Sequence, residues 1–259
     1  MELKELFTRT SLVIDDVCTL EEADVVVVGV PFDSTTVEVP GTRFGPNAIR
    51  EDFRTHLNSF DPELGELKDV KLYDAGNVRV LHGNVAKTND LIFLAVKKIL
   101  ELNSRAKILT LGGEHSITYP VVKALHEAWK FSYLCYDAHT DLWDKFSDIE
   151  LSHACGNKRI YDLLKKVEVR GFRTGEKAVF DFARSLPKVK DPVYLSLDVD
   201  VFSDKVGCPV AGFLDFETVW SEVKRRSIVA ADVVEYNPMV GKDIRVAELV
   251  KRLILKLSR

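Results

Sequence analysis

Four consecutive valines, Val25 to Val28, constrain the fold of this chain more than any other segment. In a β-strand, successive side chains point to opposite faces of the sheet, so this run presents valine to both faces. A strand that is apolar on both faces is typical of a parallel sheet covered by helices on either side. The run therefore predicts a buried parallel strand.

Short apolar segments alternate with longer helical patterns along almost the whole chain. Strands are expected at Asp24–Val30, Val70–Tyr73, Ala106–Thr110, Phe131–Tyr136, Val167–Gly171, Val193–Leu197 and Ile228–Val234. Apolar residues at helical spacing predict helices over Asn84–Leu102 and Ile244–Leu257, and the carboxylates at 215–217 favour a helix start. This alternation predicts an α/β fold with a doubly wound open sheet, and an eight-fold barrel is the alternative. No linker or repeat divides residues 1–259, so we expect one domain.

Composition excludes several classes of protein. The chain has 259 residues, 46% of them hydrophobic, and a net charge of −4, so it lacks the basic surface of a nucleic-acid-binding protein. No apolar run approaches the ~18 residues that cross a bilayer, and the charged start is unlike a signal peptide. We expect a cytoplasmic protein, not bound to membranes, whose four scattered cysteines are free thiols.

Polar motifs follow four of the expected strands at the same end. In parallel α/β sheets these ends gather into one crevice, where ligands bind. A single motif of this kind would be a weak signal, but four are not easily explained by chance. The candidate residues are His115, Asp137, His139, Asp141, Asp198, Asp200 and Glu235.

Asp137, His139 and Asp141 occupy every second position after the expected strand Phe131–Tyr136. In a strand or extended loop, residues at this spacing point the same way, whereas a helix would direct the histidine elsewhere. The spacing therefore predicts three metal ligands that converge on one point. The alternative for Asp198 and Asp200 is a helix cap, and His115 could serve only to bond a loop.

Together, four aspartates and two histidines would neutralise two divalent cations. Without cations, such clustered carboxylates repel one another and their pKa values rise. Oxygen-rich sites with some imidazole suit Mn²⁺ or Fe²⁺ and permit Zn²⁺, and the absence of cysteine disfavours a structural zinc site. Two metals about 3.5–4 Å apart activate water, which predicts metal-assisted hydrolysis. Glu235 could bind a cationic substrate group, and His153 could move protons.

These motifs resemble the signatures of the ureohydrolase family, the arginases and agmatinases. The resemblance lies in Gly112-Gly-Glu-His-Ser116, Asp137-Ala-His-Thr-Asp141, Ser196-Leu-Asp-Val-Asp200 and Val234-Glu-Tyr-Asn-Pro238. Gly29-Val-Pro-Phe-Asp33, Gly41-Thr-Arg-Phe-Gly-Pro46, Ser152-His-Ala154 and Gly171-Phe-Arg173 are similar to loops of agmatinase-type members. The resemblance covers roughly residue 24 to the C-terminus.

The resemblance implies a three-layer α/β/α sandwich and two Mn²⁺ per chain. His115, Asp137, Asp141 and Asp198 would hold one ion, and Asp137, His139, Asp198 and Asp200 the other. It also implies that Asp141 passes a proton to the leaving amine, Glu235 holds the guanidinium and His153 relays protons. The products would be urea and an amine, and the chain would form a homo-oligomer, a trimer or hexamer.

The substrate is expected to be agmatine, whose hydrolysis to putrescine belongs to polyamine biosynthesis. Arginases read a carboxylate with Asn and Ser in the loop that here is Leu142-Trp-Asp-Lys-Phe-Ser-Asp-Ile-Glu150. The acids Asp144, Asp148 and Glu150 would suit a cationic tail, although they could equally form a solvated loop. The loop after Asp200, Val201 to Pro209, also departs from the family, so arginine, guanidinobutyrate and formiminoglutamate stay open as substrates.

Two other classes of protein compete with this interpretation. A zinc deacetylase of arginase-like fold uses one metal and a tandem His-His pair, which this sequence lacks. A metal-binding relative without turnover would not need the intact ligand set and Glu235.

Overall fold

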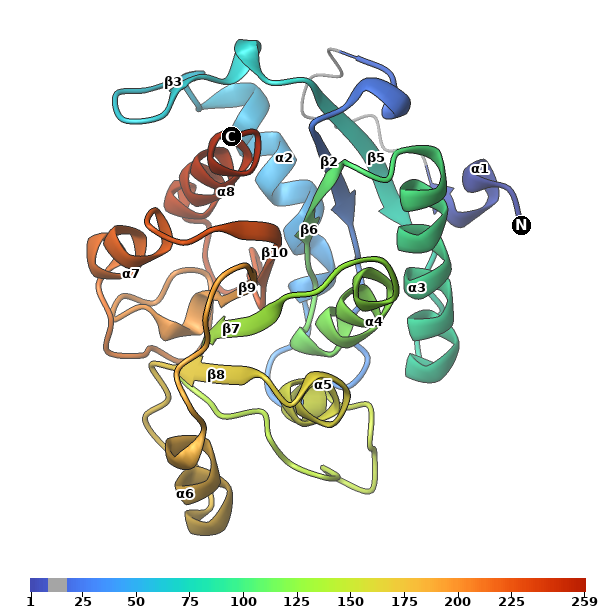
Figure 1. Ribbon diagram of the computed structural model, residues 1–259. Helices are drawn as coiled ribbons and strands as arrows, with labels where there is room; N and C mark the ends of the chain where they lie inside the picture. Colours follow the sequence, from blue (N-terminus) through green and yellow to red (C-terminus); the bar gives the residue numbers. More distant parts are fainter. Residues whose placement is uncertain (9–17) are drawn as a thin grey trace.

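The central feature of the molecule is an eight-stranded sheet in the order β1-β5-β2-β6-β10-β9-β7-β8. The computed structural model describes residues 1–8 and 18–259. All neighbouring strands are parallel except β1, which runs antiparallel to β5 at one edge. The sheet is open, with β1 and β8 at its edges, so the doubly wound sheet is confirmed and the barrel is wrong (Figure 1).

The strands follow the expected apolar segments closely. They are β1 Phe7–Thr8, β2 Val25–Gly29, β5 Leu72–Val78, β6 Lys107–Leu111, β7 Ser132–Tyr136, β8 Val167–Arg170, β9 Val193–Asp198 and β10 Ile228–Val234, with a separate hairpin of β3 Phe60–Asp61 and β4 Gly65–Glu66. Strand β5 extends beyond the expected segment. The prediction stopped short because polar residues interrupt the apolar pattern in the second half of the strand. The buried guanidinium of Arg50 lies 2.7 Å from both Asp74 Oδ1 and Asn77 Oδ1, which satisfies those polar groups inside the fold.

Helices cover both faces of the sheet (Figure 1). They are α1 Leu3–Leu6, α2 Gly45–Thr55, α3 Val85–Leu102, α4 Thr118–Ala128, α5 Gly156–Leu164, α6 Lys177–Ser185, α7 Phe216–Val223 and α8 Ile244–Leu257. The helices expected at 84–102 and 244–257 are confirmed. The expected start at 215 is also confirmed, because the Asp215 carboxylate accepts the backbone N–H of Thr218 as an N-cap.

The valine run divides its side chains between two hydrophobic cores, as its alternation requires. Val25 and Val27 belong to the core that includes α7 and α8, whereas Val26 and Val28 belong to the core that includes α3 and α4. All four are fully buried. Burial of each valine side chain contributes about 1.5–3 kcal/mol, so this one strand joins both faces of the fold.

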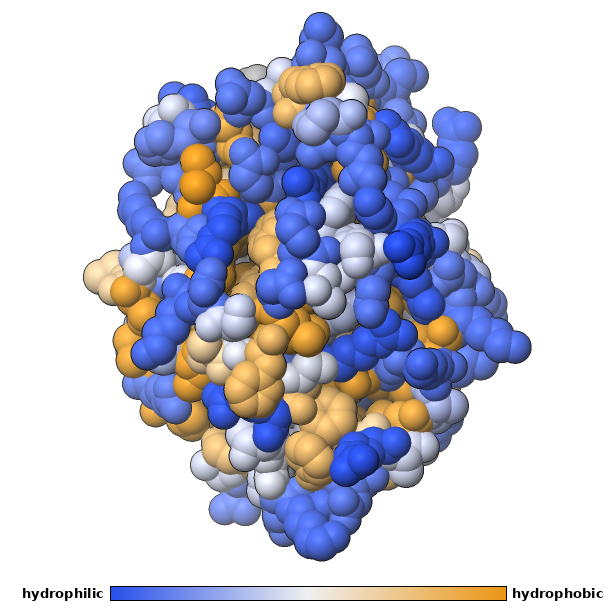
Figure 2. Space-filling view, turned by 90° about the vertical axis from the view of Figure 1, so that its left-hand side faces the viewer, coloured by the Kyte–Doolittle hydropathy of each residue, from blue (hydrophilic) through white to orange (hydrophobic). Residues whose placement is uncertain are grey.

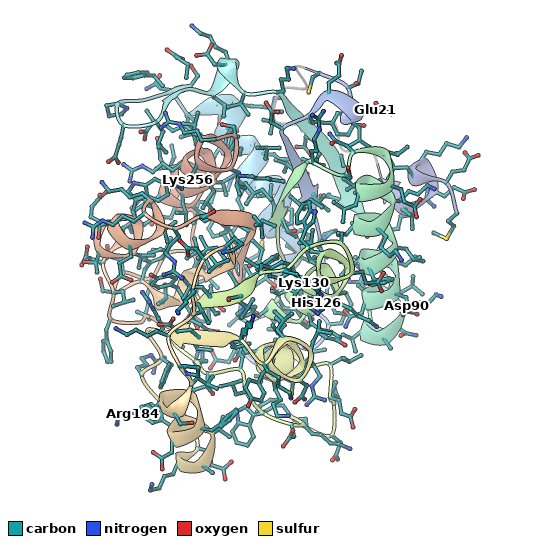
Figure 3. All side chains as sticks on the ribbon, in the orientation of Figure 1. Glu21, Asp90, His126, Lys130, Arg184 and Lys256 are labelled. Carbon is teal, nitrogen blue, oxygen red and sulfur yellow. The ribbon has the colours of Figure 1, made fainter. Side chains whose placement is uncertain are left out.

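The face of the molecule shown in Figure 2 is mainly hydrophilic. Charged side chains such as Asp90 on α3 and Arg184 on α6 lie on the outside (Figure 3). On the face shown in Figure 2, hydrophobic residues gather in smaller groups between the hydrophilic ones. None of the helices in the described part of the chain is long and apolar enough to cross a membrane.

Candidate functional site

The four motif-bearing strands are neighbours in the sheet, in the order β6-β10-β9-β7. Because they are parallel, their carboxyl ends meet at one edge. His115 follows β6, Asp137 follows β7, Asp198 ends β9 and Glu235 follows β10. Sheet order therefore brings together residues that lie up to 120 positions apart, as the bond from His115 N to Glu235 shows.

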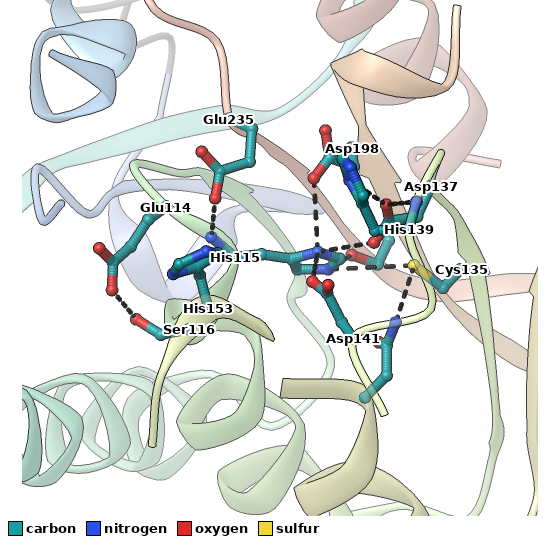
Figure 4. A network of polar contacts seen from close by, with 12 residues as sticks. Glu114, His115, Ser116, Cys135, Asp137, His139, Asp141, His153, Asp198 and Glu235 are labelled. Carbon is teal, nitrogen blue, oxygen red and sulfur yellow. Dashed lines mark hydrogen bonds and ion pairs between the residues drawn. The ribbon is translucent and has the colours of Figure 1, made fainter. Parts of the chain in front are cut away.

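His115 lies at the centre of a first group of candidate metal ligands, called here the first ligand group. Its Nδ1 atom lies 3.2 Å from Asp137 Oδ2, 3.1 Å from Asp141 Oδ2 and 3.5 Å from Asp198 Oδ2. Figure 4 shows the three carboxylates around this imidazole. All four side chains are buried, and the structure brings these four residues together.

His139 forms the second group, with Asp200 and Asp137. Its Nδ1 atom lies 2.7 Å from Asp200 Oδ2 and 3.6 Å from Asp137 Oδ1. Asp137 therefore faces His115 with one carboxylate oxygen and His139 with the other. This arrangement is the one that a bridging ligand between two cations requires.

Backbone donors fix three of these carboxylates. Asp137 Oδ1 accepts the backbone N–H of His139 at 2.6 Å, and Asp200 Oδ1 accepts that of Ala138 at 2.8 Å. Asp198 Oδ1 accepts the backbone N–H of Asp200 at 2.9 Å. Each of these aspartates thus keeps a second oxygen for a ligand.

The pKa values record how crowded these charges are. Burial, and then the neighbouring Asp137, raise the pKa of Asp141 to about 6. Burial, with Asp200 and Asp137 nearby, raises the pKa of Asp198 well above its usual value. Hydrogen bonds to Asp137 and Asp200 raise the pKa of His139 to about 12. In the absence of cations, the site compensates its negative charge by holding protons.

Two buried atoms in the first group have no hydrogen-bond partner in the described residues. They are Nδ1 of His115 and Oδ2 of Asp137, which face each other. Buried polar atoms rarely remain unsatisfied, and a cation between these two atoms would coordinate both. The donor set therefore fits a divalent metal rich in oxygen ligands.

The far side of the His115 ring shows which nitrogen can bind a metal. Ser196 Oγ donates its single proton to Asp232 Oδ1 at 2.6 Å and lies 3.0 Å from His115 Nε2. The serine oxygen must therefore accept Nε2–H, so the lone pair of the neutral ring is on Nδ1, toward the carboxylates. Such support of a ligating histidine by buried polar groups is usual in metal sites. Tyr194 holds the other oxygen of Asp232 at 2.6 Å.

Cys135 also lies beside His115, but on the side of Nε2, with 3.9 Å between the atoms. Burial raises the pKa of this thiol to about 12, so it is not a thiolate at neutral pH. A thiol on the side of the ring away from the carboxylates does not complete the ligand groups.

Two residues of the site have left-handed backbone conformations, which side chains other than glycine rarely adopt. They are Asp141, with φ 49°, and Glu235, with φ 63°. The run from Asp137 to Asp141 is therefore not extended to its end, and this bend carries Asp141 back toward His115. Glu235 is held by the backbone N–H of His115, which it accepts at 2.7 Å. Unfavourable backbone conformations of this kind concentrate at functional sites.

A cavity of about 310 Å³ opens over these residues. His139, Asp141, Asp198, Asp200 and Glu235 line its floor, and His153 lines it as well. The remaining wall is mostly apolar and includes Val37, Val39, Trp143, Phe146, Cys208, Pro209 and Val210. The divergent loop after Asp200 thus contributes to the cavity wall through Cys208 and Pro209.

Of the two roles considered for the acids of the 142–150 loop, the structure shows the solvated loop, and the contact with a cationic tail is wrong. None of Asp144, Asp148 and Glu150 lines the cavity. Asp144 forms ion pairs with Lys158 and Arg159, and Glu150 pairs with Lys145. The loop instead turns its aromatic residues inward, because these gain more from burial than exposed charges do.

Sequence reasoning missed Asp232, Glu114 and Glu38. Asp232 is an acid inside the buried strand β10, and an uncompensated charge among valines was a signal that could have revealed it. Glu114 lies within the motif Gly112 to Ser116, but the motif alone predicted no role for its side chain. Glu38 lies in a loop near Gly41, and only its position in space identifies it, on the wall of the cavity.

Comparisons with known proteins show which proteins this chain resembles. Residues 23–187 and 167–258 match the Arginase family. The chain is 33% identical to the agmatinase of Pyrococcus horikoshii, over 84% of this chain and 85% of that one. It is 34% identical to the N(1)-aminopropylagmatine ureohydrolase of Thermococcus kodakarensis, over 83% of each chain. The crystal structure of the agmatine ureohydrolase of Thermoplasma volcanium superimposes with a TM-score of 0.82 at 25% identity, over 99% of this chain and 96% of that one.

Divalent metal should stabilise this protein through Asp137. At Mn²⁺ concentrations about a hundredfold above Kd, linkage supplies about 2.7 kcal/mol, which corresponds to a Tm increase of roughly 5–10 °C. Asp137→Asn should remove most of this increase because Asp137 faces both ligand groups. Differential scanning calorimetry with and without Mn²⁺ measures both shifts.

The matched control is Asp144→Asn, an exposed aspartate outside the cavity, which should keep the full Mn²⁺ shift. A full shift in Asp137→Asn as well would place the metal elsewhere in the protein.

Proposed function

The chain belongs to the arginase family, and from that premise we propose that it hydrolyses agmatine to putrescine and urea. The observation that carries this proposal is the pair of ligand groups joined by Asp137 beneath a cavity whose described lining contains neither Lys nor Arg. The ligand groups support metal-assisted hydrolysis, and the cavity lining supports a substrate with a cationic tail.

We propose that the site holds two Mn²⁺. His115 and Asp141 would bind one ion, His139 and Asp200 the other, and Asp137 and Asp198 both. When bound, the two ions would supply an activated water molecule as nucleophile at neutral pH. The unpartnered Nδ1 of His115 and Oδ2 of Asp137 support this assignment.

Protein side chains would then bind the guanidinium and move the proton. Glu235 would hold the guanidinium nitrogens, since it lies on the cavity floor beside His115. As water adds to the guanidinium carbon, one of its protons would pass through Asp141 to the alkyl nitrogen. The bond between that nitrogen and the carbon then breaks, and the second proton of the added water also passes to the nitrogen, which releases urea and the protonated amine. His153 would exchange protons with solvent at the cavity mouth.

The charge of the cavity wall favours agmatine over related guanidino compounds. Arginine, guanidinobutyrate and formiminoglutamate carry a carboxylate, which a binding site normally pairs with Arg or Lys. Neither Arg nor Lys is among the described residues that line the cavity. Glu38 does line it, and this carboxylate forms no ion pair or hydrogen bond within residues 1–8 and 18–259. We therefore propose that Glu38 binds the distal ammonium of the substrate.

A longer polyamine is a second candidate substrate. One relative is named for N(1)-aminopropylagmatine, which extends agmatine by a further amine. The apolar wall formed by Val37, Trp143 and Phe146 would accommodate additional methylene groups. N(1)-aminopropylagmatine carries the same guanidinium group as agmatine and would be hydrolysed by the same mechanism.

Residues 1–259 are proposed to form one domain that assembles into a trimer or hexamer, works in the cytoplasm and serves polyamine biosynthesis. Exposed apolar side chains, including Phe213 and Met239 at 76% and 71% accessible, would be available for contacts between subunits.

Urea release from a panel of compounds tests the proposed activity. With Mn²⁺ present, agmatine or N(1)-aminopropylagmatine should give urea with kcat/KM at least about a hundredfold higher than arginine or guanidinobutyrate, about 2.7 kcal/mol of discrimination. Colorimetric urea determination over a concentration series gives these values. Preference for arginine would contradict the substrate, and no urea from any guanidino compound would contradict the activity.

Glu38→Gln should raise KM for agmatine about fivefold without a comparable fall in kcat. The expected loss is about 1 kcal/mol because the proposed ion pair is partly exposed to solvent. Turnover of butylguanidine, which lacks the distal ammonium, should not change.

Asp148→Asn is the matched control, since Asp148 is an exposed acid that does not line the cavity. It should leave KM for agmatine unchanged. Equal effects of the two substitutions, or an effect of Glu38→Gln on butylguanidine, would rule out the proposed contact.

A further inference from the structure

Glu114 is a fully buried carboxylate outside both ligand groups, and the described residues include no ion-pair partner for it. Its Oε1 accepts hydrogen bonds from Thr35 Oγ1 at 2.6 Å and Ser116 Oγ at 2.5 Å. Its Oε2 accepts the backbone N–H of Thr35 at 2.7 Å and lies 3.4 Å from Thr36 Oγ1. Figure 4 shows Glu114 with Ser116 on the side of His115 away from Asp137. A buried charge is costly unless it is well hydrogen-bonded, and these contacts supply donors to both oxygens of the Glu114 carboxylate.

The approach of the two loops is built into the backbone. The backbone N–H of Glu114 donates to the carbonyl of Phe32 at 2.8 Å. A Cβ atom at Gly113 would lie 2.0 Å from that carbonyl oxygen, so only glycine permits this contact. The loop after β2 is thereby held against the loop after β6, with Thr35 directed at Glu114.

The hydroxyl of Thr35 has one proton to donate, and its contacts decide where that proton lies. Glu114 accepts it at 2.6 Å. The backbone N–H of His153 donates to the same oxygen at 2.9 Å, and His153 Nδ1 lies 3.2 Å from it. Because the hydroxyl proton is already directed to Glu114, the threonine oxygen can only accept from His153. The proton of the neutral imidazole is therefore on Nδ1.

The remaining contacts of His153 are compatible with this tautomer. Ser152 Oγ lies 3.3 Å from Nδ1 and can accept from it, since a hydroxyl rotates to either role. Nε2 has no hydrogen-bond partner in the described residues, and His153 lines the cavity together with Asp141 and Glu235. Phe146 packs edge-on against the ring, with 5.9 Å between the ring centres. Burial lowers the pKa of His153, while the charge of Glu114 opposes this effect.

We propose that Thr35, oriented by Glu114, is a positioning residue that holds the proton of His153 on Nδ1 and leaves the Nε2 lone pair facing the cavity. In histidine, the bond made by one ring nitrogen determines the state of the other. Three loops, after β2, β6 and β7, thus cooperate to prepare one proton acceptor. The use of Nε2 in turnover rests on the proposed hydrolysis, but the tautomer itself does not.

The tautomer can be measured without any substrate. Nitrogen-15 NMR of the histidine rings, with His153 assigned from the His153→Asn spectrum, distinguishes a protonated Nδ1 from a protonated Nε2. Wild type and Thr35→Ser should show the proton on Nδ1, whereas Thr35→Val should shift the ring toward the Nε2–H form. A proton on Nε2 in the wild-type protein would overturn the proposal. This outcome does not depend on whether a protein with an altered Thr35 folds.

A double-mutant cycle tests whether Thr35 acts through His153. Thr35→Val should lower kcat about 10- to 100-fold with KM and bound metal unchanged, within the range for proton-transfer groups. Thr35→Ser, which keeps the hydroxyl, should restore kcat to within about threefold of wild type. In the His153→Asn background, Thr35→Val should have no further effect beyond about twofold.

An equal loss of kcat in both backgrounds, or loss of bound metal in Thr35→Val, would give Thr35 a structural role and overturn the proposal. The two proposals fail separately. If no guanidino compound yields urea but the Nδ1–H tautomer is lost in Thr35→Val alone, the proposed activity fails while the positioning role stands.

Discussion

Repulsion among buried carboxylates is the constraint on which this structure depends. Asp137, Asp141, Asp198 and Asp200 lie together at one edge of the sheet, within reach of two imidazoles. Taking a charge out of water costs several kcal/mol unless an opposite charge compensates it. Burial and the neighbouring carboxylates raise the pKa values of Asp141 and Asp198, so bound protons can supply part of this compensation. Divalent cations would complete it and would at the same time supply the chemistry.

The sheet supplies the rigidity that such a site needs. Strands β6, β10, β9 and β7 lie side by side, and the valine-rich strand β2 anchors them between two hydrophobic cores. Behind the ligands, Ser196 and Asp232 orient His115 from within the same sheet. The left-handed residues Asp141 and Glu235 come just beyond it, where the backbone must bend to reach the site. The rigid strands thus determine where the side chains of the site begin, and the loops determine the direction in which these side chains point.

The sequence predicted the sheet well because the sheet depends on local patterns, whereas the division of the polar residues into two ligand groups was implied by the family resemblance. Apolar alternation identifies strands such as β2, and the motifs at strand ends follow from parallel sheet geometry. It failed for the cavity wall, since which face of the 142–150 loop turns inward depends on ion pairs such as Asp144 with Lys158. Glu38 and Thr35 were beyond its reach for the same reason. The partners of Thr35, Glu114 and His153, are distant in the sequence, and Glu38 is identified only by its place on the cavity wall.

The central claim is that two cations share Asp137 and Asp198. Metal analysis together with electron paramagnetic resonance of the Mn²⁺-loaded protein addresses this claim most directly, because neighbouring Mn²⁺ ions that share ligands interact magnetically. The account predicts two Mn²⁺ per chain and the spectrum of a spin-coupled pair, which Asp137→Asn should replace with that of isolated Mn²⁺. A single uncoupled Mn²⁺ per chain in the wild-type protein would contradict it.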